Sequence, residues 1–203
     1  MINVCVPVLK RYDLLQNLLM SLEQSLVHPD KVFIIDNGMK RPRIQGGKIP
    51  IEVITPEQPL GVAESWNWFI RNVPEERVIV NDDVIFQPHS MSKLLASKAD
   101  LVWADGCGFS CFILRDTCVQ KIGLFDEQIS PGYAYYEDDD YLQRLDGRGT
   151  RAPSAIAETV KCGVTHLKSQ TLQAGTEKDT AEHHRKFKIA QGNYMRKWGL
   201  TTI

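Results

Sequence analysis

The sequence predicts an α/β protein built on a mostly parallel central sheet with helices packed against it. Residues 2–8 (INVCVPV) are an apolar run with the length and composition of a buried parallel strand. Leucines then recur at helical spacing from Leu14 to Leu26, after the candidate helix cap Asp13, and residues 31–35 (KVFII) are a second apolar run. Strand, helix and strand in this order predict a βαβ unit, whose strands are parallel and whose crossover is right-handed.

Length and composition limit the classes of protein to be considered. The 203 residues suit one domain, and a net charge of -1 gives no overall attraction to nucleic acid or to a membrane. No apolar run approaches the ~20 residues of a membrane span, and the first residues lack the pattern of a signal peptide. The cysteines include no CxxC pair, which favours reduced thiols in the cytoplasm over disulfides or a zinc site.

The remaining elements alternate between strands, loops and helices. Residues 39–50 are rich in Lys, Arg, Gly and Pro and are expected to form an exposed loop. Further strands are expected at residues 51–54, 78–86, 100–103 and 155–164, and residues 104–114 are expected to form a glycine-containing loop that leads into another strand. Further helices are expected at residues 61–72, 88–99, 115–123 and 176–198.

Residues 78–86 (VIVNDDVIF) combine a buried strand with an acidic pair. The strand runs directly into Asn81, Asp82 and Asp83, so these side chains are expected at its carboxyl end. Ligands bind at that edge of open α/β sheets, and hard oxygen donors there suit Mg²⁺ or Mn²⁺ holding a substrate phosphate. The alternative is an Asx turn, in which Asn and Asp bond their own backbone.

A second acidic cluster, Glu137 to Asp140, stands at the predicted start of a helix. Capping explains part of it, because the helix dipole stabilises acidic residues in a first turn. Four adjacent carboxylates exceed what capping needs, since mutual repulsion grows with each added charge, and the excess indicates a functional role. His166 follows the late strand and is either a structural histidine or a further ligand for Mn²⁺.

Some single residues are also candidates for contacts with a substrate. A glycine at a helix start, Gly61, lets backbone N–H groups approach an anion closely. Trp103, Tyr133 and Tyr135 are candidates for an aromatic face that stacks on a sugar, with core or loop packing as the alternative for each.

Short segments follow one another along nearly the whole chain in the order VCVPVLKR, IIDNG, PLGVAESWN, VNDDVIF, GLFDE, YEDDDYLQRL, THLKS and YMRKWG. Together they resemble the family 2 glycosyltransferases with a GT-A, Rossmann-like fold. The resemblance implies a mostly parallel central sheet flanked by helices, with a small acceptor-side region. Residues 1–203 would be one GT-A domain, with a nucleotide-binding half (1–100) and an acceptor and catalytic half (101–203), and a longer protein could contain it.

The resemblance also implies roles for individual residues. The donor-binding residues would be Pro7, Val8, Arg11, Asp36, Gly61, Asn67, Asn81 and Asp82. Among them, Asp36 would hydrogen-bond the uracil edge, and Asn81 stands where the family has the first Asp of its DxD motif. Asp83 and His166 would bind Mn²⁺ or Mg²⁺.

On the acceptor side, Asp138 matches the catalytic base of the family, with Glu137 beside it. Asp140 occupies its usual place downstream. Together with Trp103, Tyr133 and Tyr135, it is a candidate for acceptor binding.

Chemistry and resemblance together predict a metal-dependent inverting glycosyltransferase. It would move a sugar from a nucleoside diphosphate, UDP by the resemblance, to a hydroxyl of a glycan or glycoprotein. A closer likeness to viral members that build a capsid glycan implies rhamnose as the sugar and the host-cell cytoplasm as the location. Two other classes stay open: a nucleotide-sugar or glycan-binding module without turnover, and a metal-dependent nucleotidyltransferase, although the sequence lacks a GxGxxG or GxxxxGK[ST] phosphate loop.

Overall fold

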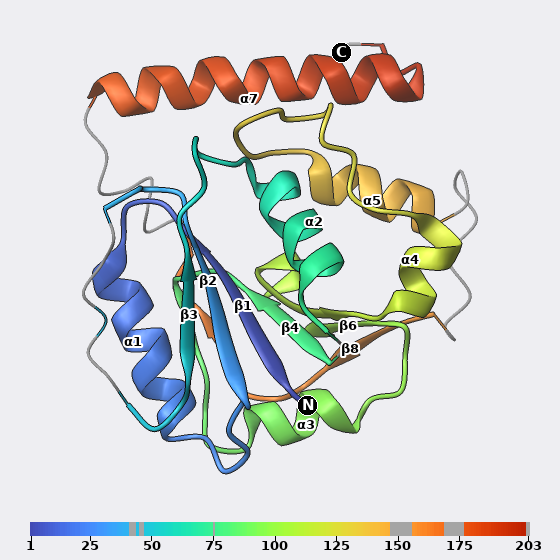
Figure 1. The fold of residues 1–203 in the computed structure, drawn as a ribbon. Helices are drawn as coiled ribbons and strands as arrows, with labels where there is room; N and C mark the ends of the chain where they lie inside the picture. Colours follow the sequence, from blue (N-terminus) through green and yellow to red (C-terminus); the bar gives the residue numbers. More distant parts are fainter. Residues whose placement is uncertain (41–43, 45–46, 75, 147–155, 169–176, 202–203) are drawn as a thin grey trace.

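A computed structural model describes residues 1–203 apart from 41–43, 45–46, 75, 147–155, 169–176 and 202–203. Within this described part, the centre of the molecule is a seven-stranded sheet with the strand order β3-β2-β1-β4-β7-β6-β8. Helices cover both of its faces, and a long C-terminal helix lies across one end of it (Figure 1). The α/β class predicted from the sequence is therefore confirmed.

Parallel pairing dominates the sheet. The strands are β1 (Asn3–Val8), β2 (Lys31–Asp36), β3 (Ile51–Ile54), β4 (Arg77–Val80), β6 (Leu101–Ala104), β7 (Cys111–Leu114) and β8 (Ala157–Val160). β1 pairs in parallel with β2 on one side and with β4 on the other, which confirms the predicted βαβ unit. β7 alone among these strands runs antiparallel to its neighbours, β4 and β6.

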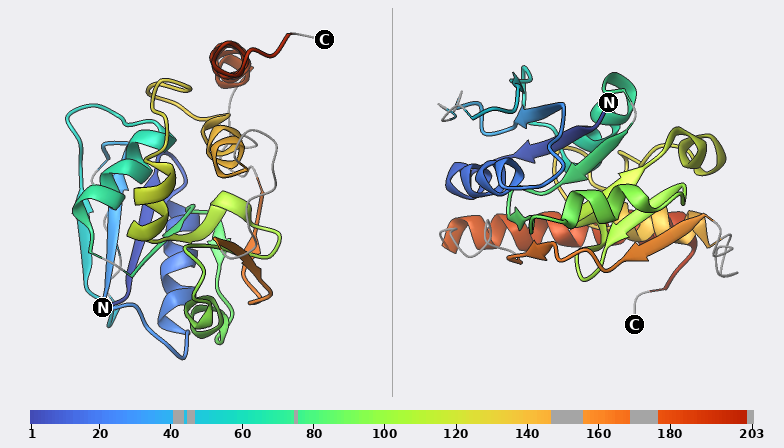
Figure 2. Two further views of the ribbon diagram at one scale, coloured as in Figure 1. Left: turned by 90° about the vertical axis from the view of Figure 1, so that its right-hand side faces the viewer. Right: turned by 90° about the horizontal axis from the view of Figure 1, so that it is seen from below.

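The helices cover the sheet in two groups (Figure 2). α1 (Tyr12–Glu23) and α3 (Ser90–Ala96) pack on one face. α2 (Val62–Asn72), α4 (Asp116–Ile122) and α5 (Glu137–Leu145) contribute to the apolar core on the other face. The last helix, α7 (Glu177–Trp198), lies across the end of the sheet at which β1 and β2 finish (Figure 1).

β1 shows why this sequence forms a central strand. Val4, Val6 and Val8 belong to the core on the α1 side, while Cys5 belongs to the opposite core, as the period-two alternation of a strand requires. Because helices cover both faces, each of these side chains is at most 1% exposed. The continuous apolar run in the sequence follows from this double burial.

The first helix differs from its prediction at both ends. Arg11 occupies the cap position, and Asp13 accepts hydrogen bonds from the Arg11 guanidinium at 2.6 and 2.8 Å instead of capping the helix. The helix ends at Glu23, so Leu26 lies beyond it and is 66% exposed rather than part of the apolar face.

Two predicted strands are each divided by a turn. β4 ends at Val80, and the short strand β5 (Val84–Ile85) follows after a turn at residues 82–83. Likewise β8 ends at Val160, and β9 (Thr165–His166) begins after a left-handed glycine, Gly163. β5 and β9 pair antiparallel in a small second sheet. The continuous strands predicted at 78–86 and 155–164 are wrong in this respect, since the chain leaves the main sheet at both turns; residues 155 and 176, at the ends of two predicted elements, lie outside the described part.

The cysteines and the helices agree with two further expectations. All five cysteines are free and buried, and burial raises the pKa of the Cys107 thiol to about 11. In the described part of the chain, no helix is both long and apolar enough to cross a bilayer.

The two ends of the leucine pattern give a test of the core. Leu18 is 0% exposed under the sheet, so Leu18→Ala should lower the free energy of unfolding by about 2–5 kcal/mol. The matched control, Leu26→Ala, removes an exposed side chain and should change it by less than about 0.5 kcal/mol. Urea denaturation of both variants measures this. Equal losses would contradict the helix boundary at Glu23.

Candidate active site

The carboxyl ends of β1, β2 and β4 meet at the edge of the sheet that faces α7 (Figure 1). Pro7 and Val8 are the last residues of β1, and Arg11 follows them. Asp36 is the last residue of β2, and Asn81, Asp82 and Asp83 follow β4. The structure thus brings to one edge most of the residues that the sequence assigned to donor binding.

Asp36 is wholly buried at the end of β2. The Tyr12 hydroxyl donates to its Oδ1 at 2.5 Å, and burial, together with this hydrogen bond, raises the pKa of Tyr12 above its usual range. The adjacent Asn37 is also buried: its amide group donates to Ser65 Oγ at 3.1 Å, and its Oδ1 accepts the Leu60 N–H at 2.9 Å. α1 and α2 together therefore fix the end of β2 at the predicted nucleotide edge.

Asp83 and His166 come together from distant parts of the sequence. β5 pairs antiparallel with β9, and the Leu167 N–H donates to the Asp83 carbonyl. These backbone contacts set the positions of Asp83 and His166. His166 Nε2 lies 3.2 Å from Asp83 Oδ1, and both side chains are largely buried. The two predicted metal ligands are therefore adjacent.

An aspartate oxygen and a histidine nitrogen are ligands that suit a divalent ion such as Mn²⁺. In the structure the two side chains are paired with each other, and side chains this close could both reach one ion. No group of three or more His, Cys, Asp or Glu side chains in the described ranges could hold a metal ion by itself. Mg²⁺ sites of this kind use one or two protein ligands together with substrate phosphates.

The charge at this edge is predominantly negative. Asp82 is 8% exposed, and burial, then the neighbouring Asp83 carboxylate, raise its pKa to about 7 although Arg11 opposes the shift. The Arg11 guanidinium interacts with Asp82 and Asp83 and is hydrogen-bonded to Asp13. Three carboxylates thus act on one guanidinium, an excess that a divalent cation would relieve.

Ser110 also belongs to this edge, which no pattern in the sequence predicts. The Asn81 N–H donates to the Ser110 carbonyl at 2.9 Å, and the Asn81 side chain donates to the Ser110 hydroxyl at 3.1 Å. Ser110 is the last residue of a short 3-10 helix, η1 (Gly108–Ser110), just before β7. The contact follows from the antiparallel pairing of β4 with β7, and the preceding Gly-Cys-Gly segment was the available hint of a loop at this place.

Glu137 and Asp138 begin α5 in different environments. Glu137 is 4% exposed and its carboxylate accepts the Ser130 hydroxyl at 2.9 Å. Burial, and after it the charge of Asp138, raise the pKa of Glu137 to about 7. Asp138 is less buried, and its Oδ1 accepts the Asp139 N–H at 3.0 Å. The predicted base is thus the more accessible of the two carboxylates.

Gly61 has a packing role at the start of α2. Its N–H donates to Glu64, and the Val62 N–H donates to the Tyr133 carbonyl at 2.8 Å. A Cβ at Gly61 would lie 2.7 Å from both the N and the O of Tyr133, so glycine is needed for this close approach. The expected anion contact at Gly61 is not supported, because these N–H groups already have partners.

Asn67 also has a structural position rather than the expected donor contact. It is 0% exposed, and its amide group donates to the Phe125 carbonyl at 2.9 Å and to Glu127 at 2.7 Å. Its Oδ1 accepts the Phe125 N–H at 3.0 Å. Both of its amide hydrogens and its carbonyl oxygen thus fasten α2 to the loop before α5.

Asp140, expected at the acceptor, instead anchors α7. It is 0% exposed and accepts hydrogen bonds from Arg144 Nε at 2.9 Å and from Trp198 Nε1 at 3.0 Å. Lys197 Nζ lies 2.6 Å from the same carboxylate. Because Arg144, Trp198 and Lys197 already occupy the buried Asp140 carboxylate, its role in the structure is to hold α7 against α5.

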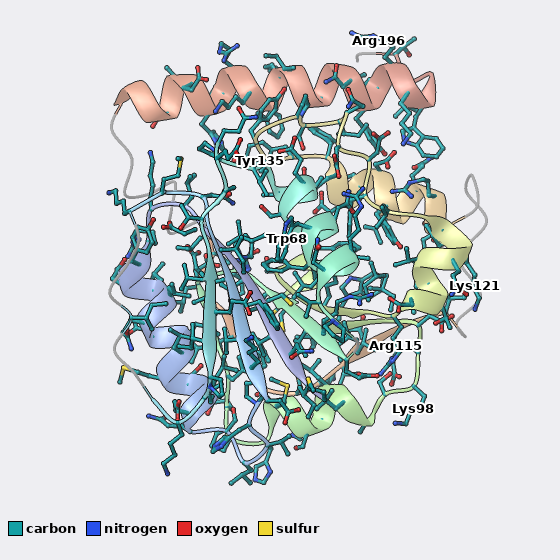
Figure 3. All side chains as sticks on the ribbon, in the orientation of Figure 1. Trp68, Lys98, Arg115, Lys121, Tyr135 and Arg196 are labelled. Atoms are coloured by element: carbon teal, nitrogen blue, oxygen red, sulfur yellow. The ribbon has the colours of Figure 1, made fainter. Side chains whose placement is uncertain are left out.

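The three aromatic candidates divide into two groups. Trp103 lies in β6 and packs edge-on against Phe109, with ring centroids 5.6 Å apart, so core packing describes it. Tyr133 and Tyr135 lie in the loop that leads to Glu137. Tyr135 lies beneath α7 in Figure 3, and Lys186 Nζ of α7 is 5.7 Å from the centre of the Tyr133 ring. Both rings are partly exposed, and both remain candidates for a contact with a sugar.

Comparison with known proteins places the fold. No family model matches the sequence, and no curated protein sequence matches it. Among solved structures, glucosyl-3-phosphoglycerate synthase from Mycobacterium tuberculosis, in complex with Mn²⁺, UDP and phosphoglyceric acid, has a TM-score of 0.65 and 15% identity, over 100% of this chain and 80% of that one. TarS 1-349 from S. aureus, in complex with UDP-GlcNAc, has a TM-score of 0.56 and 16% identity, over 83% of this chain and 60% of that one.

The chain has a GT-A fold. At these identities the likeness concerns the arrangement of strands and helices. The chain spans less than two thirds of TarS 1-349. In this GT-A chain, the edge with Asp36, Asp83 and His166 is the carboxyl edge of the parallel strands, where ligands of open α/β sheets bind.

The raised pKa of Glu137 predicts a dependence of stability on pH. The pKa lies above its ordinary value of 4.5 and reaches about 7 in the folded chain, so the folded state binds the proton more tightly than the unfolded state. The stability that this protonated carboxyl contributes is complete below pH 4.5 and is lost as the pH rises through 7. Glu137→Gln keeps the shape without the charge and should lose less stability between pH 5 and pH 8 than the wild type. Parallel pH profiles in urea denaturation would contradict the assignment.

Proposed function

We propose that this GT-A chain is a metal-dependent inverting glycosyltransferase that uses a UDP-sugar. The observation that carries the proposal is the meeting of Asp83 and His166, 3.2 Å apart, at the carboxyl edge of the sheet. Two neighbours of the same fold are complexes with Mn²⁺ and UDP or with UDP-GlcNAc, which supports the choice of nucleotide. The metal would be Mn²⁺ or Mg²⁺, and when bound it would neutralise charge on the departing diphosphate.

Donor binding would use the edge already described. Asp36 would meet the uracil, with Pro7, Val8 and Arg11 along the nucleotide. Arg11 carries a positive charge beside the acidic pair and would approach a phosphate. Asn81 and Asp82 would face the ribose or the diphosphate, and Asn81 is oriented for this by Ser110. Residues 1–100 would thus serve the nucleotide, and residues 101–203 the acceptor and the chemistry.

Asp138 would act as the base in a single displacement. It would accept the proton of the acceptor hydroxyl while the oxygen of that hydroxyl bonds to the anomeric carbon from the face opposite the diphosphate. The bond between the anomeric carbon and the diphosphate breaks in the same step, and its electron pair leaves with UDP. Attack from the opposite face inverts the configuration of the sugar. Glu137, buried behind Asp138 and bonded to Ser130, would hold the start of the helix.

The finer assignment concerns the sugar and the acceptor. The order of sequence motifs is similar to that of a glycosyltransferase domain in a large chlorella-virus protein that builds the capsid glycan. This likeness supports rhamnose as the sugar, a glycan or glycoprotein as the acceptor, and the host-cell cytoplasm as the place of action. Tyr133 and Tyr135 would then line the acceptor side.

A non-catalytic module that binds nucleotide sugars is the second candidate, because a fold by itself does not establish chemistry. It would share the nucleotide edge and the metal pair. The partly exposed Asp138 at a helix start favours turnover over binding alone.

The metal pair predicts that Mn²⁺ strengthens nucleotide binding through Asp83. In thermal shift measurements with UDP, the wild type should gain more stability with Mn²⁺ than without it. Asp83→Ala should lose this metal-dependent part, with UDP affinity in Mn²⁺ falling about tenfold or more. Asp100→Ala, a carboxylate removed just before β6 at the opposite edge, is the control and should keep it. A shift in Asp83→Ala as large as in the wild type would exclude Asp83 as a ligand.

The base assignment predicts a selective loss of turnover. UDP release from a panel of UDP-glucose, UDP-GlcNAc and UDP-rhamnose identifies the donor, and Asp138→Asn should slow release by about 10²-fold or more. UDP affinity should stay within about twofold, since Asp138 contacts the acceptor and not the nucleotide. Asp139→Asn, the exposed neighbour, should remain close to the wild type. A normal rate in Asp138→Asn would refute the assignment, and UDP binding without release by the wild type would favour the binding module.

A further inference from the structure

The backbone just before Glu137 adopts an unusual conformation. Four non-glycine residues of the described chain have positive φ, and two of them are adjacent: Tyr135 at 100° and Tyr136 at 66°. Bulky side chains rarely adopt this region, and such strained residues persist when the surrounding structure holds them in place. The strain lies directly before the helix turn that carries Asp138.

One face of α7 holds both tyrosines. The Tyr135 hydroxyl hydrogen-bonds His183 Nδ1 at 2.6 Å, and the two rings meet edge-on with centroids 4.9 Å apart. The Phe187 ring lies 5.3 Å from the Tyr135 ring and 5.3 Å from the Tyr136 ring. Tyr135 can be followed beneath α7 in Figure 3.

Two further residues on the same helix hold Tyr136. The Tyr194 ring stacks on Tyr136 at 5.2 Å, and Gln191 Nε2 donates to the Tyr136 hydroxyl at 3.1 Å. His183, Phe187, Gln191 and Tyr194 are spaced by three or four residues and therefore share one face of α7, which we call the clamp face.

The two tyrosines lead directly into the helix turn that carries Asp138. Tyr136 caps α5, and its carbonyl accepts the first helical hydrogen bond, from Asp140 N at 2.9 Å. Glu137, Asp138 and Asp139 are the three residues between these ends. Beyond them, Trp198 and Lys197 bind the Asp140 side chain. α7 therefore holds the first turn of α5 from both sides of Asp138.

α7 contributes little to the apolar core. Among residues 180–198, for which burial is described, Ala190 is the one buried side chain. Removing a partly exposed ring from the clamp face should therefore leave the sheet and both cores intact. This separates a role in geometry from a role in folding.

We infer that the clamp face of α7 is part of the active site, where His183, Phe187, Gln191 and Tyr194 act as positioning residues that fix Asp138 through Tyr135 and Tyr136. The inference rests on the proposed function, because it gives Asp138 a reaction to perform. It assigns to α7 a task that its sequence pattern, a long amphipathic helix with a basic surface, did not suggest.

The experiment compares Phe187→Ala with Ile189→Ala in the full chain. Ile189 is an apolar residue of the same helix, 40% exposed and two positions away, on a different face. With the UDP-sugar that the wild type hydrolyses in the presence of Mn²⁺, Phe187→Ala should lower kcat about 10- to 100-fold, as expected when a reacting group is misplaced. Its KM for the donor, its UDP affinity and its Tm should stay close to those of Ile189→Ala.

A readout independent of activity accompanies the kinetics. Hydrogen exchange of the backbone amides of residues 133–139 should be faster in Phe187→Ala than in Ile189→Ala. A double-mutant cycle adds Tyr136→Gly, because glycine adopts a φ near 66° without help. If the clamp acts through this backbone, Phe187→Ala should slow the Tyr136→Gly variant less than it slows the wild type.

The outcomes separate the two proposals. A wild type that releases UDP from no UDP-sugar would overturn the proposed function and with it the reaction assigned to Asp138. An active wild type whose Phe187→Ala variant matches Ile189→Ala in kcat and in exchange would overturn the clamp alone. A parallel fall of kcat and of UDP affinity would also overturn it, since general loosening of the fold would then explain the result.

Discussion

The parallel pairing of β1 with β2 on one side and β4 on the other is the constraint on which the other features depend. Helices on both faces require the strand residues to be apolar, so polar residues are displaced to the strand ends. Because parallel strands point the same way, their carboxyl ends deliver Arg11, Asp36 and the acidic pair after β4 to one edge. The negative charge collected there, and the raised pKa of Asp82 that accompanies it, are consequences of this topology. A cation is the simplest means of balancing such a site.

The other half of the site is attached to this edge by a short series of contacts. Asn37, at the end of β2, binds the backbone before α2. Gly61 and the residue after it then meet the backbone of Tyr133, so the start of α2 carries the loop that leads to Glu137. Asn67 binds the same loop further upstream, at Phe125. Hydrogen bonds through α2 therefore connect the carboxyl edge of the sheet with the loop before the predicted base, Asp138. A change at any of these contacts should alter the geometry at both places.

The sequence predicted the features that depend on local pattern. The βαβ unit, the acidic residues at the end of β4 and the helix start at Glu137 each follow from periodicity or composition within a few residues, and the structure has them. The residues to which the structure gives a packing role instead have partners far along the chain. Asn67 and Asp140 have the same chemistry in a buried hydrogen-bond network as in a ligand site, and only their contacts with Phe125 and Trp198 distinguish the two.

α7 also owes its importance to contacts with residues far along the chain. Its sequence is that of a long amphipathic helix with a basic face, which indicates a solvated surface. In the described range α7 buries one small side chain, Ala190, so it contributes little to the stability of the fold. Its aromatic and amide side chains nevertheless contact Tyr135 and Tyr136, the two tyrosines with positive φ. Contacts that contribute little to folding but hold an unfavourable backbone conformation are typical of functional sites. The position of α7 across the end of the sheet is therefore explained by its contacts with the residues before α5 (Figure 1).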